Sequence, residues 1–248
     1  MGIYQHKKNF FIKYCDVDFC DKLKVSSALS LMQEVAGSSA DELGLGYMDL
    51  KKRNLAFIVS NICCEFLQPI TFGENVMVKT WPTPPTRFVF GREYQFVSEQ
   101  GEICVNASSR WCLLDMETGR LQPSKVFDKQ DYSTYNTTKL FEDVKWKIPT
   151  VAQSEGELSF SLKIANSEYD HNMHVNNAKY ADYCFNCFTV SELREWKLKN
   201  FSISYIKQCR EGEVLRFYRK EQENHEWLVT GFNEKDEVVV QARIGFAS

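Results

Sequence analysis

Several features that would set this chain apart from an ordinary globular protein are missing. None of its apolar runs approaches the ~18–20 residues of a membrane-spanning helix. The formal net charge of −3 lacks the basic excess of a general nucleic-acid binder. The opening stretch, MGIYQHKKNFFIKY, contains no apolar core of a signal peptide. We therefore expect a cytoplasmic chain with no membrane span and no nucleic-acid partner.

The cysteines also lack the pattern of disulfides or of a metal site. There are 9 of them, an odd number, and most lie among apolar neighbours, as Cys63 and Cys64 do. Cys184 and Cys187 form a CxxC pair, but neither a second pair nor a histidine follows at zinc spacing. We expect reduced, buried thiols, no metal and no cofactor bound by the chain itself.

A length of 248 residues, 44% of them hydrophobic, is sufficient for two domains. The chain also carries a faint internal repeat. VSSA at 25–28 matches VNNA at 175–178, an offset of 175 − 25 = 150. Each match follows an alternating strand, FFIKY at 10–14 and LSFSLKI at 158–164, and opens an apolar helix.

The helices have recognisable ends. In the first half, apolar residues recur at helical spacing from Val25 to Leu43 and stop before Gly44, a suitable C-terminal cap. We expect Ser26 or Ser27 to cap this helix and Asn176 or Asn177 to cap the second, because their side chains accept hydrogen bonds from first-turn N–H groups.

Strand-like runs separated by turn residues follow each helix. The expected strands lie at 55–67, 75–81, 87–97 and 103–115, and at 201–209, 213–220, 226–233 and 237–247. The pattern predicts an α+β fold in which each half is an antiparallel sheet packed on a long helix. We place the domains at 1–120 and 158–248, joined by a connection over 121–157.

The second helix is preceded by the sequence EYDHNMHVNNAKY, in which Asp170, Asn172 and His174 alternate. In an extended segment, residues two apart share a face, so these three side chains would converge while His171 and Met173 turn away. The following helix N-terminus would stabilise a developing negative charge. Taken alone, a D-x-N-x-H sequence is also compatible with a simple turn.

The segment Asp170-x-Asn172-x-His174-Val175-Asn-Asn, with Tyr180 and SYIKQC at 204–209, resembles the acyl-acyl carrier protein (ACP) thioesterases. The family fold is a tandem pair of hotdog domains, each a sheet wrapped around a central helix. Trp81 and Arg92 resemble features of its first half. The resemblance implies hydrolysis of fatty acyl-ACP to free fatty acid and holo-ACP, with a phosphopantetheine-bearing carrier protein as partner.

The same resemblance implies catalytic roles for Asp170, Asn172 and His174. The family also has a glutamate directly before its cysteine, and this chain has Gln208 there, which can orient water but cannot take its proton. The role of general base then shifts to His174 or to Asp170. As an alternative role, His174 would protonate the leaving thiol. Asn172 would hold the water or the oxyanion, and Asp170 would orient His174 or attack the carbonyl itself.

Cys209 is an alternative nucleophile, since Cys209, His174 and Asn172 would form a papain-like set. In a regular strand Gln208 and Cys209 point to opposite faces, and Cys209 falls in the row of Phe201 that packs on the helix. We favour attack by water. A bulge in the strand would overturn this argument.

Three other functions stay open. One is an acyl-CoA thioesterase, and a second is a non-catalytic hotdog protein that binds acyl groups, which Gln208 makes conceivable. Hotdog enoyl hydratases resemble the segment but carry an extra residue between Asn and His, where this chain has only Met173, so a hydratase fits less well. A homodimer is compatible with the resemblance.

At the offset of 150, the first half places Cys20, Lys22 and Lys24 where the second has Asp170, Asn172 and His174. That set cannot repeat the same chemistry, so we expect one catalytic centre per chain and a first half that serves as scaffold and acyl-chain wall. Four aromatic residues expected on one strand face would line an acyl slot or simply fill the core: Phe88, Phe90, Tyr94 and Phe96. Seven basic residues are candidates for carrier docking or plain surface: Lys51, Lys52, Arg53, Lys197, Lys199, Lys207 and Arg210.

Overall fold

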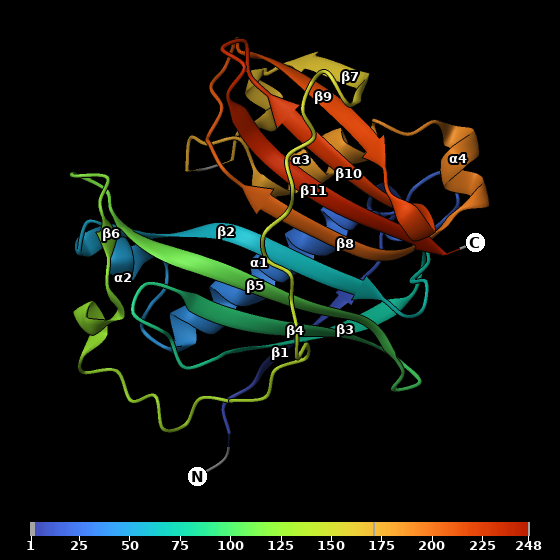
Figure 1. Ribbon diagram of the computed structural model, residues 1–248. Helices are drawn as coiled ribbons and strands as arrows, with labels where there is room; N and C mark the ends of the chain where they lie inside the picture. The colour runs from blue at the N-terminus through green and yellow to red at the C-terminus, as the bar shows by residue number, and fades with distance from the viewer. Residues whose placement is uncertain (1–2, 171, 248) are drawn as a thin grey trace. The chain divides into compact units, whose positions relative to one another are not determined.

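The computed structural model describes residues 3–170 and 172–247 (Figure 1). The chain divides into two compact units. Unit 1 comprises Met1–Lys24, Ala28–Ile62 and Leu67–Val144, and unit 2 comprises Val25–Ser27, Cys63–Phe66 and Lys145–Ser248. Within the described residues, no helix has the length and apolar character needed to span a membrane.

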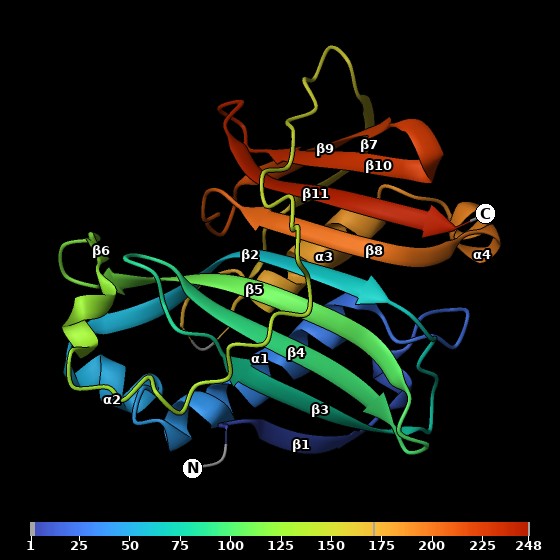
Figure 2. The same ribbon diagram turned by 60° about the horizontal axis from the view of Figure 1, so that its bottom comes forward.

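Unit 1 contains an antiparallel sheet and a long helix. The strands run in the order β1-β3-β4-β5-β2, and β6 pairs with β5. Their bounds are His6–Phe11 (β1), Leu55–Phe66 (β2), Asn75–Pro82 (β3), Phe90–Ser98 (β4), Ile103–Asp115 (β5) and Leu121–Gln122 (β6). Two helices, α1 (Val25–Glu42) and the short α2 (Tyr47–Lys52), complete the unit. Figures 1 and 2 show α1 running along one face of the sheet.

Helix α1 forms because its apolar residues recur every three or four positions. Ala28, Met32 and Val35 are all buried. The guanidinium of Arg92 on β4 donates to the Ser39 hydroxyl at 2.9 Å and so ties the helix to the sheet. The C-terminal prediction is confirmed, since Leu43 caps the helix and Gly44 follows in the left-handed region at φ +68°.

The predicted serine cap of α1 is wrong. The N-cap is Lys24, whose side chain makes no capping hydrogen bond, and Ser26 and Ser27 already lie inside the helix. The first strand is also displaced from the expected 10–14. It ends at Phe11 because the chain turns after Ile12, where the Asp16 carboxylate accepts the Lys13 N–H at 2.9 Å.

Unit 2 repeats the plan with a shorter helix. Its strands are ordered β8-β11-β10-β9-β7, all pairs antiparallel. The bounds are Glu157–Lys163 (β7), Lys197–Tyr205 (β8), Val214–Glu221 (β9), Glu226–Phe232 (β10) and Val238–Ala247 (β11), with helices α3 (Asn177–Phe185) and α4 (Val190–Glu195). Aromatic rings of α3 contact rings of the sheet: Tyr180 with Tyr205, Tyr183 with Phe217 and Phe185 with Phe201.

The expected connection, residues 121–157, is divided between the two units and packs in each of them. Its first part belongs to unit 1, where Phe127 lies in a buried cluster with Leu50 and Leu113. Its last part belongs to unit 2, where Ile148 and Val151 pack on the sheet. The boundary between the two units lies at Val144/Lys145.

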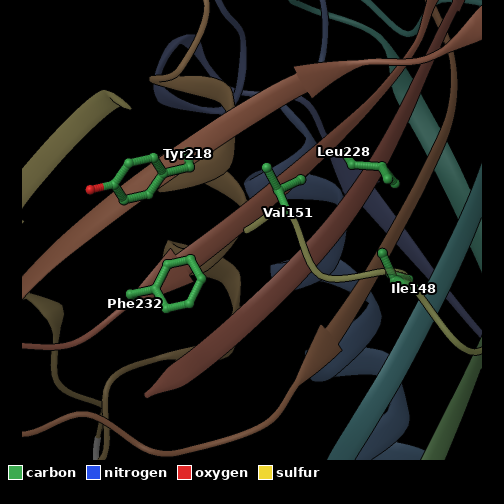
Figure 3. Packing of buried hydrophobic residues seen from close by; sticks show 5 residues of the cluster. All are labelled: Ile148, Val151, Tyr218, Leu228 and Phe232. Atoms are coloured by element: carbon green, nitrogen blue, oxygen red, sulfur yellow. The ribbon is translucent and has the colours of Figure 1, made fainter. Parts of the chain in front are cut away.

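The segment 145–156 covers the face of the unit 2 sheet opposite α3. Phe217 of β9 contacts α3, so its neighbour Tyr218 faces the other side. Figure 3 shows Tyr218 there with Leu228, Phe232, Ile148 and Val151, which form one buried cluster. The Val151 N–H also donates to the Thr230 hydroxyl at 2.9 Å. Both faces of this sheet are therefore covered by the chain itself.

The internal repeat is confirmed, but its offset is 152 rather than 150. Ile12 and Ile164 occupy matching places: each is buried, accepts one backbone N–H (from Gly73 and Gly212) and donates its own to a glutamate carbonyl. The difference, 164 − 12 = 152, also relates the first residues of α1 and α3, 177 − 25 = 152. This shift of two residues changes which side chains of the two halves correspond.

Candidate functional site

The segment 170–174 is named the site loop, and its described residues, Asp170 and 172–174, belong to a turn that precedes the N-cap of α3. Tyr169 and Val175 on either side pair as an isolated antiparallel bridge. Across the loop, the Asp170 N–H donates to the His174 carbonyl at 2.8 Å. The expected extended segment is therefore wrong. The Asp170 carboxylate contacts the backbone N–H groups of Asn172 and His174, so the three residues lie on a closed turn and not on one strand face.

The turn forms because a short acidic side chain can organise its own backbone. The Asp170 carboxylate oxygen Oδ1 accepts the Asn172 N–H at 2.8 Å and lies 3.5 Å from the His174 nitrogen, a long contact. Met173 then takes the left-handed conformation, at φ +60°, and donates its N–H to the Asp170 carbonyl at 3.1 Å. The carboxylate thus holds the backbone that carries Asn172 and His174.

The loop presents its middle to the outside. Asn172 is exposed, and Met173 is 74% exposed. Asp170 and His174 are half-buried. His171, which we expected to turn away from the site, lies outside the described residues. An exposed amide and a half-buried imidazole on one turn are accessible to a bound substrate.

The site loop leads into α3 through a capped N-terminus. Val175 is buried, and Asn176 is the N-cap, whose side chain accepts the Ala178 N–H at 2.9 Å. This confirms the expected asparagine cap. The Asn176 N–H donates to the Glu168 carbonyl at 2.8 Å and fixes the approach of the chain. His174 therefore lies two residues before the cap, close to the positive end of the helix dipole.

A second segment, residues 206–211, lies beside the site loop. The Glu211 N–H donates to the hydroxyl of Tyr169, the residue directly before the loop, at 2.7 Å. The Tyr180 hydroxyl of α3 hydrogen-bonds the Cys209 thiol. These two links hold Gln208 and Cys209 close to the start of α3. Neither link was foreseen, although the resemblance had drawn attention to Tyr180.

The predicted strand through Gln208 and Cys209 is too long. Strand β8 ends at Tyr205, because the Ile206 and Lys207 N–H groups both donate to the Val239 carbonyl and break the regular ladder. Gln208 is exposed and Cys209 is 1% exposed, so the two side chains still point in different directions.

The buried surroundings of Cys209 keep its thiol protonated. Burial raises the pKa of Cys209, and the hydrogen bond from Tyr180 opposes the rise only in part. Burial also raises the pKa of Tyr180 well above its ordinary value. Because the thiolate is the nucleophilic form, a thiol held neutral is poorly suited to attack a thioester. Its burial and the raised pKa of its thiol therefore weigh against Cys209 as the nucleophile.

Tyr205 is a further supporting residue that sequence reasoning missed. Its hydroxyl donates to the Asn177 carbonyl in the first turn of α3 at 3.0 Å, and its ring lies 5.9 Å from that of Tyr180. The available signal was a tyrosine three residues before Gln208 on a strand expected to contact the helix. Together, Tyr169, Tyr180 and Tyr205 fix the site segments through their hydroxyl groups.

Unit 1 contains a loop of the same construction, residues 18–22, named the counterpart loop. The bridge Val17–Leu23 closes it, and the Asp18 N–H donates to the Lys22 carbonyl at 2.8 Å. Because 170 − 18 = 152, the residue corresponding to Asp170 is Asp18. The earlier correspondence with Cys20, Lys22 and Lys24 is thus wrong by two positions, and the corresponding set is Asp18, Cys20 and Lys22.

The aromatic residues proposed for an acyl slot lie in different surroundings. Tyr94 and Phe96 are buried on β4. Phe90 contacts Phe57 and Phe127 in the cluster of unit 1. Phe88 precedes β4, so it does not share the strand face expected of it. Core packing accounts for the contacts of Phe90.

The CxxC pair occupies the core. Cys184 and Cys187 are both buried, and burial raises the pKa of each, to about 12 for Cys187. The pair is only partly helical, since α3 ends at Phe185. In residues 3–170 and 172–247, no cluster of three or more His, Cys, Asp or Glu side chains is arranged to hold a metal ion.

Comparison with known proteins supplies the family. The model of the acyl-ACP thioesterase N-terminal domain matches residues 3–129, and that of the C-terminal domain matches residues 151–248. Among curated relatives, a chloroplastic palmitoyl-acyl carrier protein thioesterase from Cuphea hookeriana is 24% identical over 221 residues, covering 84% of this chain and 53% of the relative. An oleoyl-acyl carrier protein thioesterase 2 from Arabidopsis thaliana is 20% identical, covering 86% and 62%. The chain thus spans about half the length of the curated relatives it matches.

Solved structures show the same fold. An acyl-ACP thioesterase from Bacteroides thetaiotaomicron superposes with a TM-score of 0.89 at 20% identity, covering 98% of this chain and 97% of the other. A 12:0-ACP thioesterase from Umbellularia californica gives 0.88 at 20% identity, with 99% of each chain covered. The predicted α+β tandem hotdog is confirmed. With family models matched across both halves, the chain belongs to the acyl-ACP thioesterase family.

Proposed function

We propose that this protein hydrolyses the thioester of fatty acyl-ACP and releases free fatty acid and holo-ACP. The observation that carries the proposal is the match of both family domains to a chain whose site loop presents Asn172 and His174 beside the start of α3. The names of the relatives in Cuphea and Arabidopsis include palmitoyl- and oleoyl-acyl carrier protein, which supports a fatty acyl substrate.

His174 moves the proton in the proposed reaction. Its imidazole takes a proton from water as the water oxygen bonds to the thioester carbonyl carbon. The carbon–sulfur bond then breaks, and the imidazolium returns the proton to the leaving sulfur. One water is consumed, and one carboxylic acid and one thiol are formed, so no oxidant or cofactor is needed. The only prosthetic group involved is the phosphopantetheine on the carrier protein.

Asn172 stabilises the charge that develops on the carbonyl oxygen. The Asn176 side chain already accepts the Ala178 N–H, so that first-turn donor is engaged in capping. Stabilisation of the oxyanion therefore falls to the exposed Asn172 amide, supported by the dipole of α3. A well-placed donor of this kind contributes about 10²–10³ in rate. Gln208 orients the attacking water from the neighbouring segment.

Unit 1 has a supporting role in this proposal. Its counterpart loop has Cys20 and Lys22 in place of the amide and the imidazole, which leaves one catalytic centre per chain. We assign unit 1 as scaffold and acyl-chain wall, with Tyr94 and Phe96 on its buried sheet face. A cytoplasmic location and a homodimer are further parts of the proposal, the first supported by nine free cysteines.

One observation favours a second candidate, a protein that binds acyl groups without hydrolysing them. Gln208 stands where the family resemblance implies a glutamate, and an amide cannot act as a base. Release of thiol distinguishes the two functions, since a binding protein retains the acyl chain without freeing it.

The test is turnover of purified protein with a panel of acyl-ACP substrates of increasing chain length, followed by thiol release. We expect hydrolysis of one or more members, faster than hydrolysis of the matching acyl-CoA. His174→Ala should lower kcat by ~10²–10⁴. Equal turnover of both carriers would indicate an acyl-CoA thioesterase, and acyl binding without thiol release would contradict the enzyme assignment.

A further inference from the structure

The site loop and the counterpart loop share their backbone hydrogen bonds almost atom for atom. Asp21 corresponds to Met173 and takes the left-handed conformation at φ +62°. Its N–H donates to the Asp18 carbonyl at 3.1 Å, the same length as the Met173 to Asp170 bond. The described residues of the site loop therefore share these backbone features with the counterpart loop, although the two sequences differ.

The aspartate side chains are used in the same way. Asp18 Oδ1 accepts the Cys20 N–H at 2.8 Å and the Lys22 N–H at 3.0 Å. Asp170 Oδ1 accepts the Asn172 N–H at 2.8 Å and lies 3.5 Å from the His174 nitrogen. Both carboxylates accept from the residues two and four positions further along.

The remaining side chains of the two loops differ completely. Asn172 corresponds to Cys20 and His174 to Lys22, and only the aspartate is common to both. Without the amide and the imidazole, the counterpart loop cannot carry out the proposed chemistry, yet it retains the aspartate and its contacts. The aspartate and its backbone contacts therefore occur together in a loop that lacks the amide and the imidazole.

We infer that Asp170 is a positioning residue for the proposed hydrolysis, and neither its nucleophile nor its base. Its Oδ1 holds the two backbone N–H groups that set the directions of the Asn172 and His174 side chains. The inference rests on the proposed function, and it leaves proton transfer to His174 and stabilisation of the oxyanion to Asn172.

The chemical requirement on Asp170 follows from this role. The position needs a short side chain with an acceptor oxygen, and it does not need a negative charge. An asparagine keeps an acceptor oxygen at Oδ1 and has no carboxylate that could attack a carbonyl or take a proton. Alanine removes the acceptor, and with it the two contacts that fix the loop.

The experiment compares Asp170→Asn with Asp170→Ala in acyl-ACP hydrolysis, with Asp18→Asn and Asp18→Ala as matched controls in unit 1. We expect Asp170→Asn to keep kcat within about fivefold of the wild type, with an unchanged pH profile. Asp170→Ala should lose about 10² in kcat with little change in KM, because misplacement of reacting groups by ~1 Å has an effect of that size. Both Asp18 variants should keep full activity.

Amide chemical shifts of the same variants report on the loop itself. The Asn172 and His174 N–H signals should stay downfield in Asp170→Asn and move upfield in Asp170→Ala, and the Cys20 and Lys22 signals should respond alike to the Asp18 variants. If Asp170→Ala does not fold, Asp170→Ser takes its place, since serine supplies a weaker acceptor for the same turn.

Two outcomes would overturn the inference. Loss of about 10³ or more in Asp170→Asn, as in His174→Ala, would make the carboxylate a nucleophile or base. Full activity in Asp170→Ala would show that the contacts have no influence on turnover. Failure of the proposed function is a separate result, because wild-type protein would then release no thiol from any acyl-ACP.

Discussion

The site loop and the counterpart loop are one turn with two sets of side chains. In both, an aspartate accepts the N–H of the residue two positions on at 2.8 Å, and a left-handed residue closes the turn. They differ in what they present: an amide and an imidazole in unit 2, a thiol and an ammonium group in unit 1. The comparison separates residues that make the shape from residues that supply the chemistry.

The surroundings of the two loops differ as well. The Leu67 and Gln68 N–H groups donate to the Cys104 carbonyl just as those of Ile206 and Lys207 donate to Val239, an offset of 206 − 67 = 139. At this offset Gln208 corresponds to Pro69 and Cys209 to Ile70. Unit 1 therefore has Pro69 and Ile70 in place of Gln208 and Cys209, and its loop has neither an amide nor an imidazole.

The largest effect is expected from removing the side chain at the last position of each loop, His174 in unit 2 and Lys22 in unit 1. His174→Ala should reduce kcat by ~10³, because general acid–base catalysis contributes in that range. Lys22→Ala, at the corresponding position, should leave hydrolysis unchanged. Thiol release from acyl-ACP measures both, and similar losses in the two variants would contradict a single catalytic centre.

Introducing the asparagine and the histidine of the site loop into the counterpart loop tests whether the loop alone is sufficient for catalysis. The double change Cys20→Asn with Lys22→His gives the counterpart loop the same three polar residues. In a His174→Ala background we expect no recovery of activity, because Pro69 and Ile70 replace the Gln208–Cys209 segment. Recovery to about a tenth of wild-type turnover would show that the loop suffices without that segment.

An intermediate effect is expected at Gln208 and Cys209. Gln208→Glu should raise kcat by about tenfold, since a carboxylate beside the loop can act as a base, and this gain should disappear as the pH falls through the glutamate pKa. Cys209→Ser should keep activity within about threefold. A pH-rate profile of each variant is the measurement. Loss of about 10³ in Cys209→Ser, or an acyl label on Cys209, would restore the covalent mechanism.

Stability should depend on pH through the buried thiols and phenols of unit 2. Burial raises the pKa values of Cys184, Cys209 and Tyr180, so the folded state holds these protons more tightly than the unfolded state. Their contribution to the free energy of unfolding is complete below the thiol pKa of the unfolded chain, about 8.5. It is lost as the pH rises through the pKa values of the folded state. The Tm should fall between about pH 8 and pH 10, and less steeply in Cys184→Ala.

The smallest effect is expected at the left-handed residues. Met173→Gly and Asp21→Gly each relieve the strain of a side chain at positive φ. Glycine also makes the unfolded chain more flexible, which offsets part of this gain in stability. We expect each to raise the free energy of unfolding by ~0.5 kcal/mol, whereas Met173→Val should lower it by ~1 kcal/mol or more. Urea unfolding measures all three, and stabilisation by valine would contradict the left-handed assignment.

The strands and long helix were predictable because burial imposes a regular period. The β5 prediction, 103–115, agrees with Ile103–Asp115, since alternating apolar residues leave little choice. Errors arose where a local hydrogen bond, from a side chain or from irregular backbone, ends a strand. Asp16 ends the first strand early, and a bifurcated acceptor at Val239 ends β8 before Gln208. Local hydrogen bonds of this kind have no periodic signal.

The site residues proposed from residue type stay a prediction, and the expected geometry of their segment is wrong. Asp170, Asn172 and His174 lie on one loop, but the expected alternation is a turn held by Asp170 itself. The offset of 150 came from matching letters in VSSA and VNNA, and backbone hydrogen bonds showed it to be 152. Letter matching misplaced Asp18, the residue most informative about Asp170.

The segment that covers the outer face of the unit 2 sheet determines where this protein can be divided. Ile148 and Val151 shield Tyr218, Leu228 and Phe232. A fragment that starts at residue 158 would leave those three side chains open to water and prone to self-association. A soluble C-terminal fragment must therefore retain Ile148 and Val151, and removal of this covering segment would expose an apolar surface.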